Sequence, residues 1–289
     1  MERKKILLAS IGAFFFNLSA STEATFNRFV IVIASYNNID YYKGNIDSVL
    51  MQDYPREYMR VVYIDDCSPD GTGDAVEEYI TENDAHDFIT VIRNTERKRC
   101  LANQYAAIHA SDDNEIVIIL DGDDQLYDKT VVSFVNSIYR ENPEIWMTYG
   151  QYYIEPGGTR GHCIPYPQWV VRYNAFRRHE HIPSHLRTFR VALFKKIKKE
   201  DLMDEDEFLP MTGDMAMNIP LIEMARNGHY RFVSRYLCRY NGANPLNDHK
   251  VSKELQRKYD LLVRSREPYD ALESLDDQRI EKEVVEFAE

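Results

Sequence analysis

Short runs of large apolar residues alternate with segments of helical periodicity along the first half of the chain. The runs occupy residues 29–34 (FVIVIA), 60–64, 88–92 and 116–120 (IVIIL). Between them, apolar residues recur at helical spacing at about 45–52, 73–81 and 101–110. Continuous apolar runs are typical of strands buried on both faces, and strands that alternate with helices form parallel sheets. The pattern predicts an α/β fold with a Rossmann-like, mostly parallel sheet flanked by helices.

The second half begins with the same kind of helix and strand pattern, which is then interrupted. A helix is predicted at 129–140 and a strand at 145–149, but prolines and glycines interrupt residues 150–185, where Tyr, Trp, His and Arg are frequent. Such a loop-rich, aromatic surface suits a polyhydroxylated ligand, although an ordinary packed loop has the same composition. Regular structure is expected again at 186–197, and a helix at about 214–228.

The acidic sequence that follows the last apolar run is the strongest candidate for chemistry. Asp121, Gly122, Asp123 and Asp124 come directly after the buried strand at 116–120. In an open α/β sheet, ligands bind at the carboxyl ends of the strands, and a glycine lets the backbone turn tightly there. Clustered carboxylates need a cation, and hard oxygen ligands suit Mg²⁺ or Mn²⁺ carrying a phosphate. The alternative is a polar turn without a ligand.

Composition limits the classes of binding partner that are expected, and the cysteines bear on the cellular compartment. The 289 residues carry 47 acidic and 35 basic side chains, a formal charge of −12, which argues against nucleic acid as the main partner. Four widely spaced cysteines form no C-x-x-C pair, so neither a zinc nor a redox motif is indicated. Free thiols are expected, with two disulfides as the alternative if the chain is exported.

The first 24 residues resemble a targeting segment. Arg3, Lys4 and Lys5 precede an apolar run at 6–18, which small residues follow. This layout fits a secretory signal, a membrane anchor or a misassigned start codon. The corresponding locations are cytoplasmic or membrane-associated, with an exported or lumenal protein as the alternative. The last residues, 251–289, are predicted to form a charged, solvated helical tail.

Four stretches together resemble the inverting glycosyltransferases of family 2, which have the GT-A fold. They are IVIASYNN at 31–38, VVYIDDCSPDGT at 61–72, IVIILDGDDQLYD at 116–128 and TGDMAMNIPLIEMA at 212–225. Each is weak alone, but all four occur in the family's order. The resemblance implies one glycosyltransferase domain at 25–250, with a nucleotide-binding half at 25–128 and an acceptor half at 129–250.

The resemblance also implies roles for individual residues. Ala34, Tyr36 and Asp66, with Asp65 beside it, would hold the nucleotide base, and a carboxylate that accepts from a uracil N–H favours a UDP-sugar. Asp121 would reach the ribose. Asp123, or Asp124 in the neighbouring register, would hold Mn²⁺ or Mg²⁺. One departure is Ala102-Asn103, where the family often has Arg-Asn; Arg97 or its basic neighbours would supply the missing charge.

Asp214 falls where the family has its catalytic base. Its other interpretation is a helix N-cap, a position that Asp favours.

Arg187 and Arg190 would hold a diphosphate or an anionic acceptor, or coat the following segment. The residues at 150–185, with the loop at 240–250, are predicted to form the acceptor side and a mobile lid, in which a surface position for His249 is favoured over a metal ligand.

The implied activity is transfer of a hexose from a nucleotide sugar, with inversion, to a saccharide, lipid-linked or protein acceptor. Two alternatives come from other classes. A haloacid dehalogenase-like phosphohydrolase also has Asp-x-Asp after a buried strand, but usually on the first strand. A non-catalytic carbohydrate-binding protein would not need the carboxylates. Sugar-nucleotide pyrophosphorylases share the sheet but have a Gly-rich, Arg-containing loop where this chain has SYNN.

Overall fold

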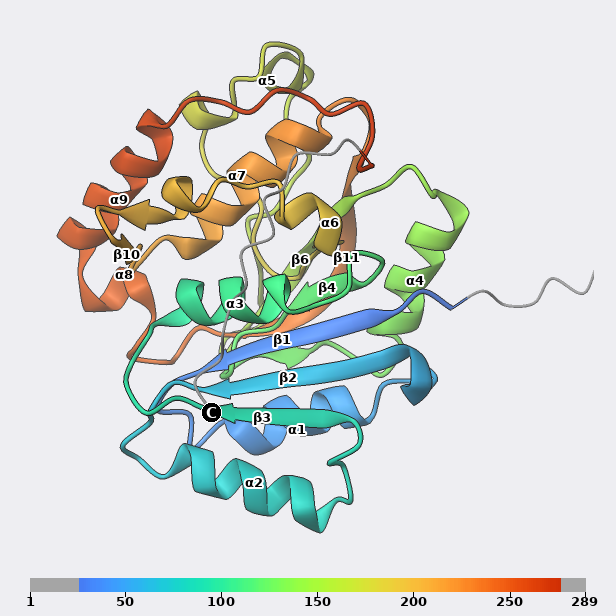
Figure 1. Ribbon diagram of the computed structural model, residues 1–289, viewed down its shortest axis with the longest axis vertical. Coiled ribbons are helices and arrows are strands. Elements are labelled where there is room, and N and C mark those ends of the chain that lie inside the picture. The colour runs from blue at the N-terminus through green and yellow to red at the C-terminus, as the bar shows by residue number, and fades with distance from the viewer. Residues whose placement is uncertain (1–25, 277–289) are drawn as a thin grey trace, which may run out of the picture.

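The computed structural model describes residues 26–276, and Figure 1 shows their arrangement. The predicted targeting segment and the end of the predicted tail, 277–289, lie outside the described residues. Four parallel strands form the first part of the sheet, in the order β3-β2-β1-β4. They are β1 (Phe29–Ser35), β2 (Met59–Asp65), β3 (Ile89–Arg93) and β4 (Ile116–Ile119). The predicted α/β fold with a mostly parallel sheet is confirmed.

Helices cover both faces of this sheet. Helices α1 (Tyr42–Leu50) and α2 (Thr72–Glu82) lie together on one side, and α3 (Cys100–His109) lies on the other with α6 (Val191–Phe194) and α7 (Gly213–Ala225) (Figure 1). Helix α4 (Val131–Glu141) follows the acidic turn. Its buried side chains, among them Val132 and Val135, recur at helical spacing, as the sequence predicts.

The second part of the sheet continues past β4 in the order β8-β6-β11-β5. These strands are β8 (Arg187–Arg190), β6 (Met147–Glu155), β11 (Tyr230–Asn241) and β5 (Gln125–Leu126); β7 (Thr159–Arg160) pairs with β6. β8 is antiparallel to both of its neighbours, whereas β6 and β11 run parallel to each other. The amino end of β8 therefore lies at the edge where β1, β2 and β4 have their carboxyl ends.

Short elements complete the molecule; η1 (Arg56–Tyr58) adjoins β2, and most of the others lie near α7. They are the helices α5 (Gln168–Arg172), α8 (Asp248–Val251) and α9 (Lys253–Ser265), the 3-10 turns η1, η2 (Phe176–Arg178) and η3 (Lys199–Leu202), and the small hairpin of β9 (Met203–Asp204) and β10 (Glu207–Phe208). A buried, bidentate ion pair joins Arg177 of η2 to Glu223 of α7, with both N–O distances 2.8 Å. The Arg177 guanidinium also donates to the carbonyl of Val263 in α9.

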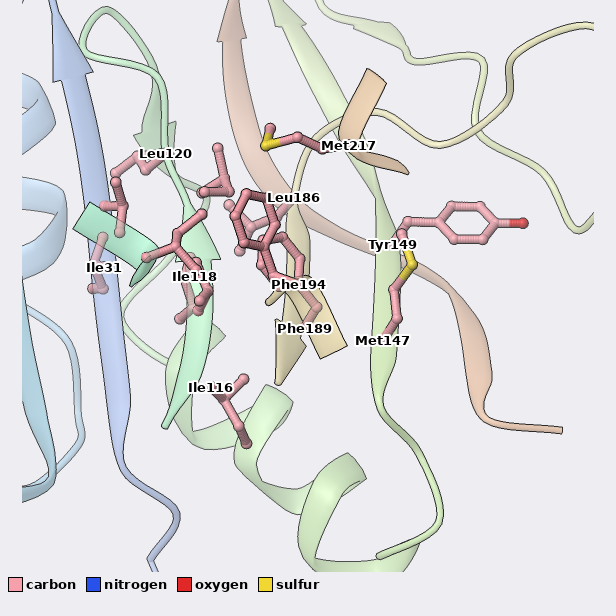
Figure 2. Close-up of a cluster of buried hydrophobic side chains, with 14 of the residues drawn as sticks. Ile31, Ile116, Ile118, Leu120, Met147, Tyr149, Leu186, Phe189, Phe194 and Met217 are labelled. Carbon is pink, nitrogen blue, oxygen red and sulfur yellow. The ribbon is translucent and has the colours of Figure 1, made fainter. Parts of the chain in front are cut away.

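The core lies where β4 meets β8 and α7 covers the sheet. Figure 2 shows Ile118, Leu186 and Phe194 gathered there, with Met217 of α7 close by. All four side chains are fully buried. Burying a side chain of this size stabilises a fold by roughly 1.5–3 kcal/mol, so this region anchors the start of β8 beside the acidic turn.

Two long elements have no clear signal in the sequence. Three arginines of β11, namely Arg231, Arg235 and Arg239, interrupt its apolar pattern, and each is paired with a residue of a neighbouring segment. Helix α9 is highly charged, but Tyr259 and Val263 are buried on one face. The part of the predicted tail at 253–265 is therefore a packed helix. No helix within residues 26–276 is both long and apolar enough to cross a membrane.

Candidate functional site

A cavity of about 520 Å³ opens at the edge of the sheet where β1, β2 and β4 end. Its wall combines the turns after these strands with the start of β8, the start of α7 and the loop after β11. Residues with predicted roles that line it are Ala34, Tyr36, Asp66, Arg97, Asp121, Asp123, Arg187 and Asp214. The structure thus brings together residues that the sequence separates by as many as 180 positions.

The turns after β1 and β2 are joined by hydrogen bonds. The backbone N–H groups of Asn37 and Asn38 donate to the hydroxyls of Ser68 and Thr72, at 3.0 and 2.9 Å. The carboxylate of Asp70 accepts from Thr72 and from the backbone of Ile39. These bonds fix one end of the cavity before any ligand binds.

Asp66 holds the loop that precedes α3. Its carboxylate accepts from the backbone N–H groups of Lys98 and Arg99 and from the side chain of Asn94, each at 2.8 Å. A carboxylate offers about four lone-pair sites, so room for one further donor remains. Asp65 does not line the cavity; it is buried, burial raises its pKa, and it accepts from the backbone of Ser68 at 3.3 Å.

Arg97 and Tyr36 contact each other at this end of the cavity. The Arg97 guanidinium lies 3.7 Å from the centre of the Tyr36 ring, a cation–π contact. Both residues line the cavity together with Asp66. A flat base can therefore meet an aromatic face, a guanidinium and a carboxylate at one place.

The acidic turn has two half-buried carboxylates that line the cavity, Asp121 and Asp123, and one fully buried carboxylate, Asp124. Asp121 and Asp123 line the cavity, and the side-chain amide of Asn45 holds the turn by donating to the carbonyls of Asp121 and Asp124. Gly122 is required for close approach, because a Cβ there would lie 2.6 Å from Asn38 Nδ2 and 2.8 Å from Ser35 Cβ. Its backbone does not adopt a positive φ.

Asp123 lies between the cavity and the loop after β11. Burial, together with the charge of Asp121, raises the pKa of Asp123 to about 6. The side chain of Asn244 donates to Asp123 Oδ2 at 2.6 Å. The loop at 240–250 thus already touches one of the predicted metal ligands, although the side chain of His249 is outside the described part of the molecule.

Asp124 turns away from the cavity and is fully buried. Its Oδ1 accepts from the backbone of Asn241 at 2.8 Å, and its Oδ2 lies 3.3 Å from His185 Nδ1 and 3.7 Å from Cys238 Sγ. Burial and the charges of Asp123 and Asp121 raise the pKa of Asp124 well above its usual value. Because only Asp123 of this pair lines the cavity, the geometry favours Asp123 as the ligand of a metal bound there.

Asp214 and Arg187 form the opposite wall. Asp214 stands in the first turn of α7, whose N-cap is Thr212, so the N-cap interpretation of Asp214 is wrong by two residues. Burial raises the pKa of Asp214, but nearby positive charge outweighs it and lowers the value overall. The lowering of this pKa comes from His181, which lies 3.8 Å away, from Arg187 and from the backbone N–H of Met215.

Arg187 supplies the positive charge at the centre of the cavity. Its guanidinium is buried and lies 3.4 Å from both carboxylate oxygens of Asp121. Its Nε has no hydrogen-bond partner. Arg190, three residues later in β8, instead donates to the carbonyls of Ile145 and Pro143 and does not line the cavity.

Several residues of the site were not predicted from the sequence. They are His181, His185, Cys238, Asn241 and Asn244. All lie on or beside the loops and antiparallel strands of the second half. Two signals marked segments but not individual positions: the density of His and aromatic residues at 150–185, and the polar loop at 240–250.

Comparisons with known proteins agree with this geometry. The sequence matches Glycosyl transferase family 2 over residues 30–200, which includes the acidic turn and ends before Asp214. A comparison with curated protein sequences gives no match.

Crystal structures of TarS from S. aureus, residues 1–349, have a similar fold. One superposes with a TM-score of 0.58 at 19% identity, covering 74% of this chain and 60% of that one. The complex with UDP-GlcNAc gives 0.55 at 17% identity, covering 78% and 61%. The chain thus spans about three fifths of the length of these TarS structures. Since the family match covers more than half of the chain, the protein belongs to glycosyl transferase family 2 and has the GT-A fold.

Proposed function

We propose that the protein transfers a sugar from a nucleoside diphosphate sugar to an acceptor hydroxyl, with inversion at the anomeric carbon. The observation that carries this proposal is the arrangement of one cavity with a base-sized polar end, an acidic turn in the middle and the carboxylate of Asp214 opposite. UDP is the expected nucleotide, because Asp66 retains one lone-pair site for a uracil N–H. TarS was crystallised with UDP and with UDP-GlcNAc, which supports the same choice.

The residues present fit a divalent metal beside the diphosphate. Asp121 and Asp123 face one cavity, and burial together with the negative charge of Asp121 raises the pKa of Asp123 to about 6. Asp123 would hold Mn²⁺ or Mg²⁺, both of which prefer carboxylate oxygens. When bound, the ion supplies positive charge where negative charge grows on the leaving diphosphate. Arg187 supplies further positive charge from the other side.

Asp214 is the base in this proposal. The acceptor oxygen forms a bond to the anomeric carbon, the bond from that carbon to the diphosphate breaks, and the acceptor proton moves to Asp214. Its lowered pKa keeps the carboxylate ionised at neutral pH, and its place in the first turn of α7 favours the negative charge. A base that is already ionised can accept the proton as the new bond forms.

The loops of the second half form the acceptor side in this proposal. His162, Ser184 and Met211 line the same cavity as Asp214, and Asn244 connects the loop at 240–250 to Asp123. The acceptor is a saccharide, a lipid-linked molecule or a protein. Closing the loop over the donor would exclude water, which competes with the acceptor for the anomeric carbon.

A panel of nucleotide sugars with Mn²⁺ tests the proposal. Release of the nucleoside diphosphate with one class of donor is the expected result, and NMR of the product should show inverted anomeric configuration. Excess EDTA should abolish the reaction, and full activity in EDTA would remove the metal from the mechanism. Release of phosphate from simple esters, without sugar transfer, would instead indicate a phosphohydrolase.

A further inference from the structure

Three side chains of different chemistry meet behind the acidic turn: Asp124, His185 and Cys238. One ligand atom of each lies within 4.8 Å of the other two. Asp124 and Cys238 are fully buried, whereas the His185 side chain is 12% exposed. The three come from the end of the acidic turn, the segment before β8 and the middle of β11.

Two of the three spacings match the edges of a tetrahedral metal centre. With zinc bond lengths of about 2.1 Å to oxygen and nitrogen and about 2.3 Å to sulfur, tetrahedral ligands lie about 3.4 Å (O to N) and about 3.6 Å (O to S) apart. The observed distances from Asp124 Oδ2 are 3.3 Å to His185 Nδ1 and 3.7 Å to Cys238 Sγ. For the third pair, His185 and Cys238, the separation of the ligand atoms is at most 4.8 Å.

Hydrogen bonds among the three groups explain the spacing less well. A charged pair normally closes to about 2.7–2.9 Å, and Asp124 Oδ1 does so with the backbone of Asn241 at 2.8 Å. Cys238 offers only a weak S–H donor. The contacts of Asp124 Oδ2 with His185 Nδ1 and Cys238 Sγ, at 3.3 and 3.7 Å, are longer than such a charged hydrogen bond.

The surroundings of the three residues suit a metal centre. The His185 ring stacks on Tyr240, with centroids 4.9 Å apart, and contacts the edge of Tyr152 at 5.4 Å, which fixes its orientation. Fixed outer contacts of this kind orient metal ligands. His185 also lines the cavity, which provides a path for entry, and Asp121 Oδ2 lies 3.5 Å from its Nδ1 as the nearest fourth ligand.

We propose that Asp124, His185 and Cys238 bind a zinc-type transition metal at a site distinct from the one proposed at Asp123. A thiolate and an imidazole select zinc or cobalt over magnesium and calcium, because the latter prefer oxygen. Binding displaces the thiol proton of Cys238 to solvent and leaves sulfur bound as thiolate. The ion links the acidic turn, the segment before β8 and β11, and thereby holds the wall that carries His185 and Arg187.

Cobalt binding to the metal-free full-length protein tests the site directly. Tetrahedral Co²⁺ with a thiolate ligand gives a charge-transfer band in the near ultraviolet and strong visible absorption. One equivalent of Co²⁺ should produce both in the wild type, and Zn²⁺ should bleach them. Cys238→Ser should lose the charge-transfer band, and its zinc affinity should fall by at least roughly 100-fold, since even outer contacts of metal ligands change affinity by about 10–100-fold.

Cys163→Ser is the matched control, because Cys163 is also fully buried but lies outside the cluster. It should keep the band, as should Asp123→Asn if the two sites are distinct. A wild-type protein without the band, or a band that survives in Cys238→Ser, would overturn the proposal.

If Cys238→Ser does not fold, alkylation of the wild-type protein in increasing urea provides the test instead. Zn²⁺ should protect Cys238 from alkylation more than it protects Cys163. Equal protection of the two cysteines would contradict the proposed site.

Discussion

The two ends of the cavity hold their charged side chains in different ways. In the amino-terminal half, residues 26–128, Asp66 accepts three hydrogen bonds of 2.8 Å, and Asp70 ties the first two turns together. In the carboxyl-terminal half, residues 129–276, neither ring nitrogen of His181 has a hydrogen-bond partner, and Arg187 Nε has none either. Ionisable groups without partners are costly when buried.

This difference separates a preformed end of the cavity from one that a ligand completes. The network around Asp66 fixes its loop in the absence of nucleotide. His181, Arg187 and Asp214 instead face each other at longer distances, 3.8 Å in the case of His181 and Asp214. We therefore expect substitutions in the first half to change donor binding and those in the second half to change the chemical step.

The largest expected effect is on the chemical step. Asp214→Asn should lower kcat by about 10²–10⁴-fold, the usual contribution of a general base, with little change in the KM for the donor. Steady-state kinetics with the best donor provide the measurement. Asp87→Asn, at an exposed position, is the control and should retain wild-type rates. A near wild-type kcat for Asp214→Asn would assign the base elsewhere.

A substitution in the first half should raise the KM for the donor and change kcat much less. Asp66→Ala removes three hydrogen bonds from the loop that carries Arg97, so the donor KM should rise roughly 10–100-fold while kcat changes much less. Asp74→Ala is matched in type but removes only an exposed ion pair with Arg93, and it should leave KM unchanged. An unchanged KM for Asp66→Ala would place the base pocket elsewhere.

The buried His181 should make stability depend on pH. Burial lowers its folded-state pKa to about 4, whereas the unfolded value is 6.5. Between these values the unfolded chain binds more protons, so stability is complete above pH 6.5 and falls as the pH decreases. The contribution should approach about 1.4 kcal/mol per pH unit near pH 5.

Urea unfolding of the wild type and His181→Asn between pH 4.5 and 7.5 measures this contribution. The variant should show a shallower dependence of unfolding free energy on pH, whatever its absolute stability. His86→Asn, at an exposed position, should keep the wild-type slope. Equal slopes for all three proteins would mean that His181 titrates normally in the folded state.

The smallest expected effect concerns the proposed lid at 150–185 and 240–250. UDP with Mn²⁺ should slow proteolysis of both segments, but neither alone should do so. Asn244→Ala removes the 2.6 Å hydrogen bond to Asp123 and should speed cleavage of the second segment by about 2–10-fold without ligand, as expected for one hydrogen bond. Equal cleavage under all conditions would show that neither segment is a lid ordered by the donor.

Much of the amino-terminal half could be predicted because its signals are local. Buried strands such as 116–120 are continuous apolar runs, and turns with Asp, Asn and Gly follow them. Parallel strands bring such turns to one edge whatever the side chains, and the resemblance to the family gave Tyr36, Asp66 and Asp121 roles at one nucleotide sugar. The roles of these residues remain predictions, because their positions and not their chemistry are observed.

Only the tertiary structure determined which residues of the second half pack against these turns. β8 enters the sheet antiparallel between β4 and β6, so its first residue, Arg187, pairs with Ile119 beside the acidic turn. Asn241 reaches Asp124 across 117 positions of sequence through the long strand β11. Strand order and direction depend on the total burial of many side chains, which no short window of sequence records. For this reason the sequence identified the carboxylates, whereas folding alone placed His185 and Cys238 against Asp124.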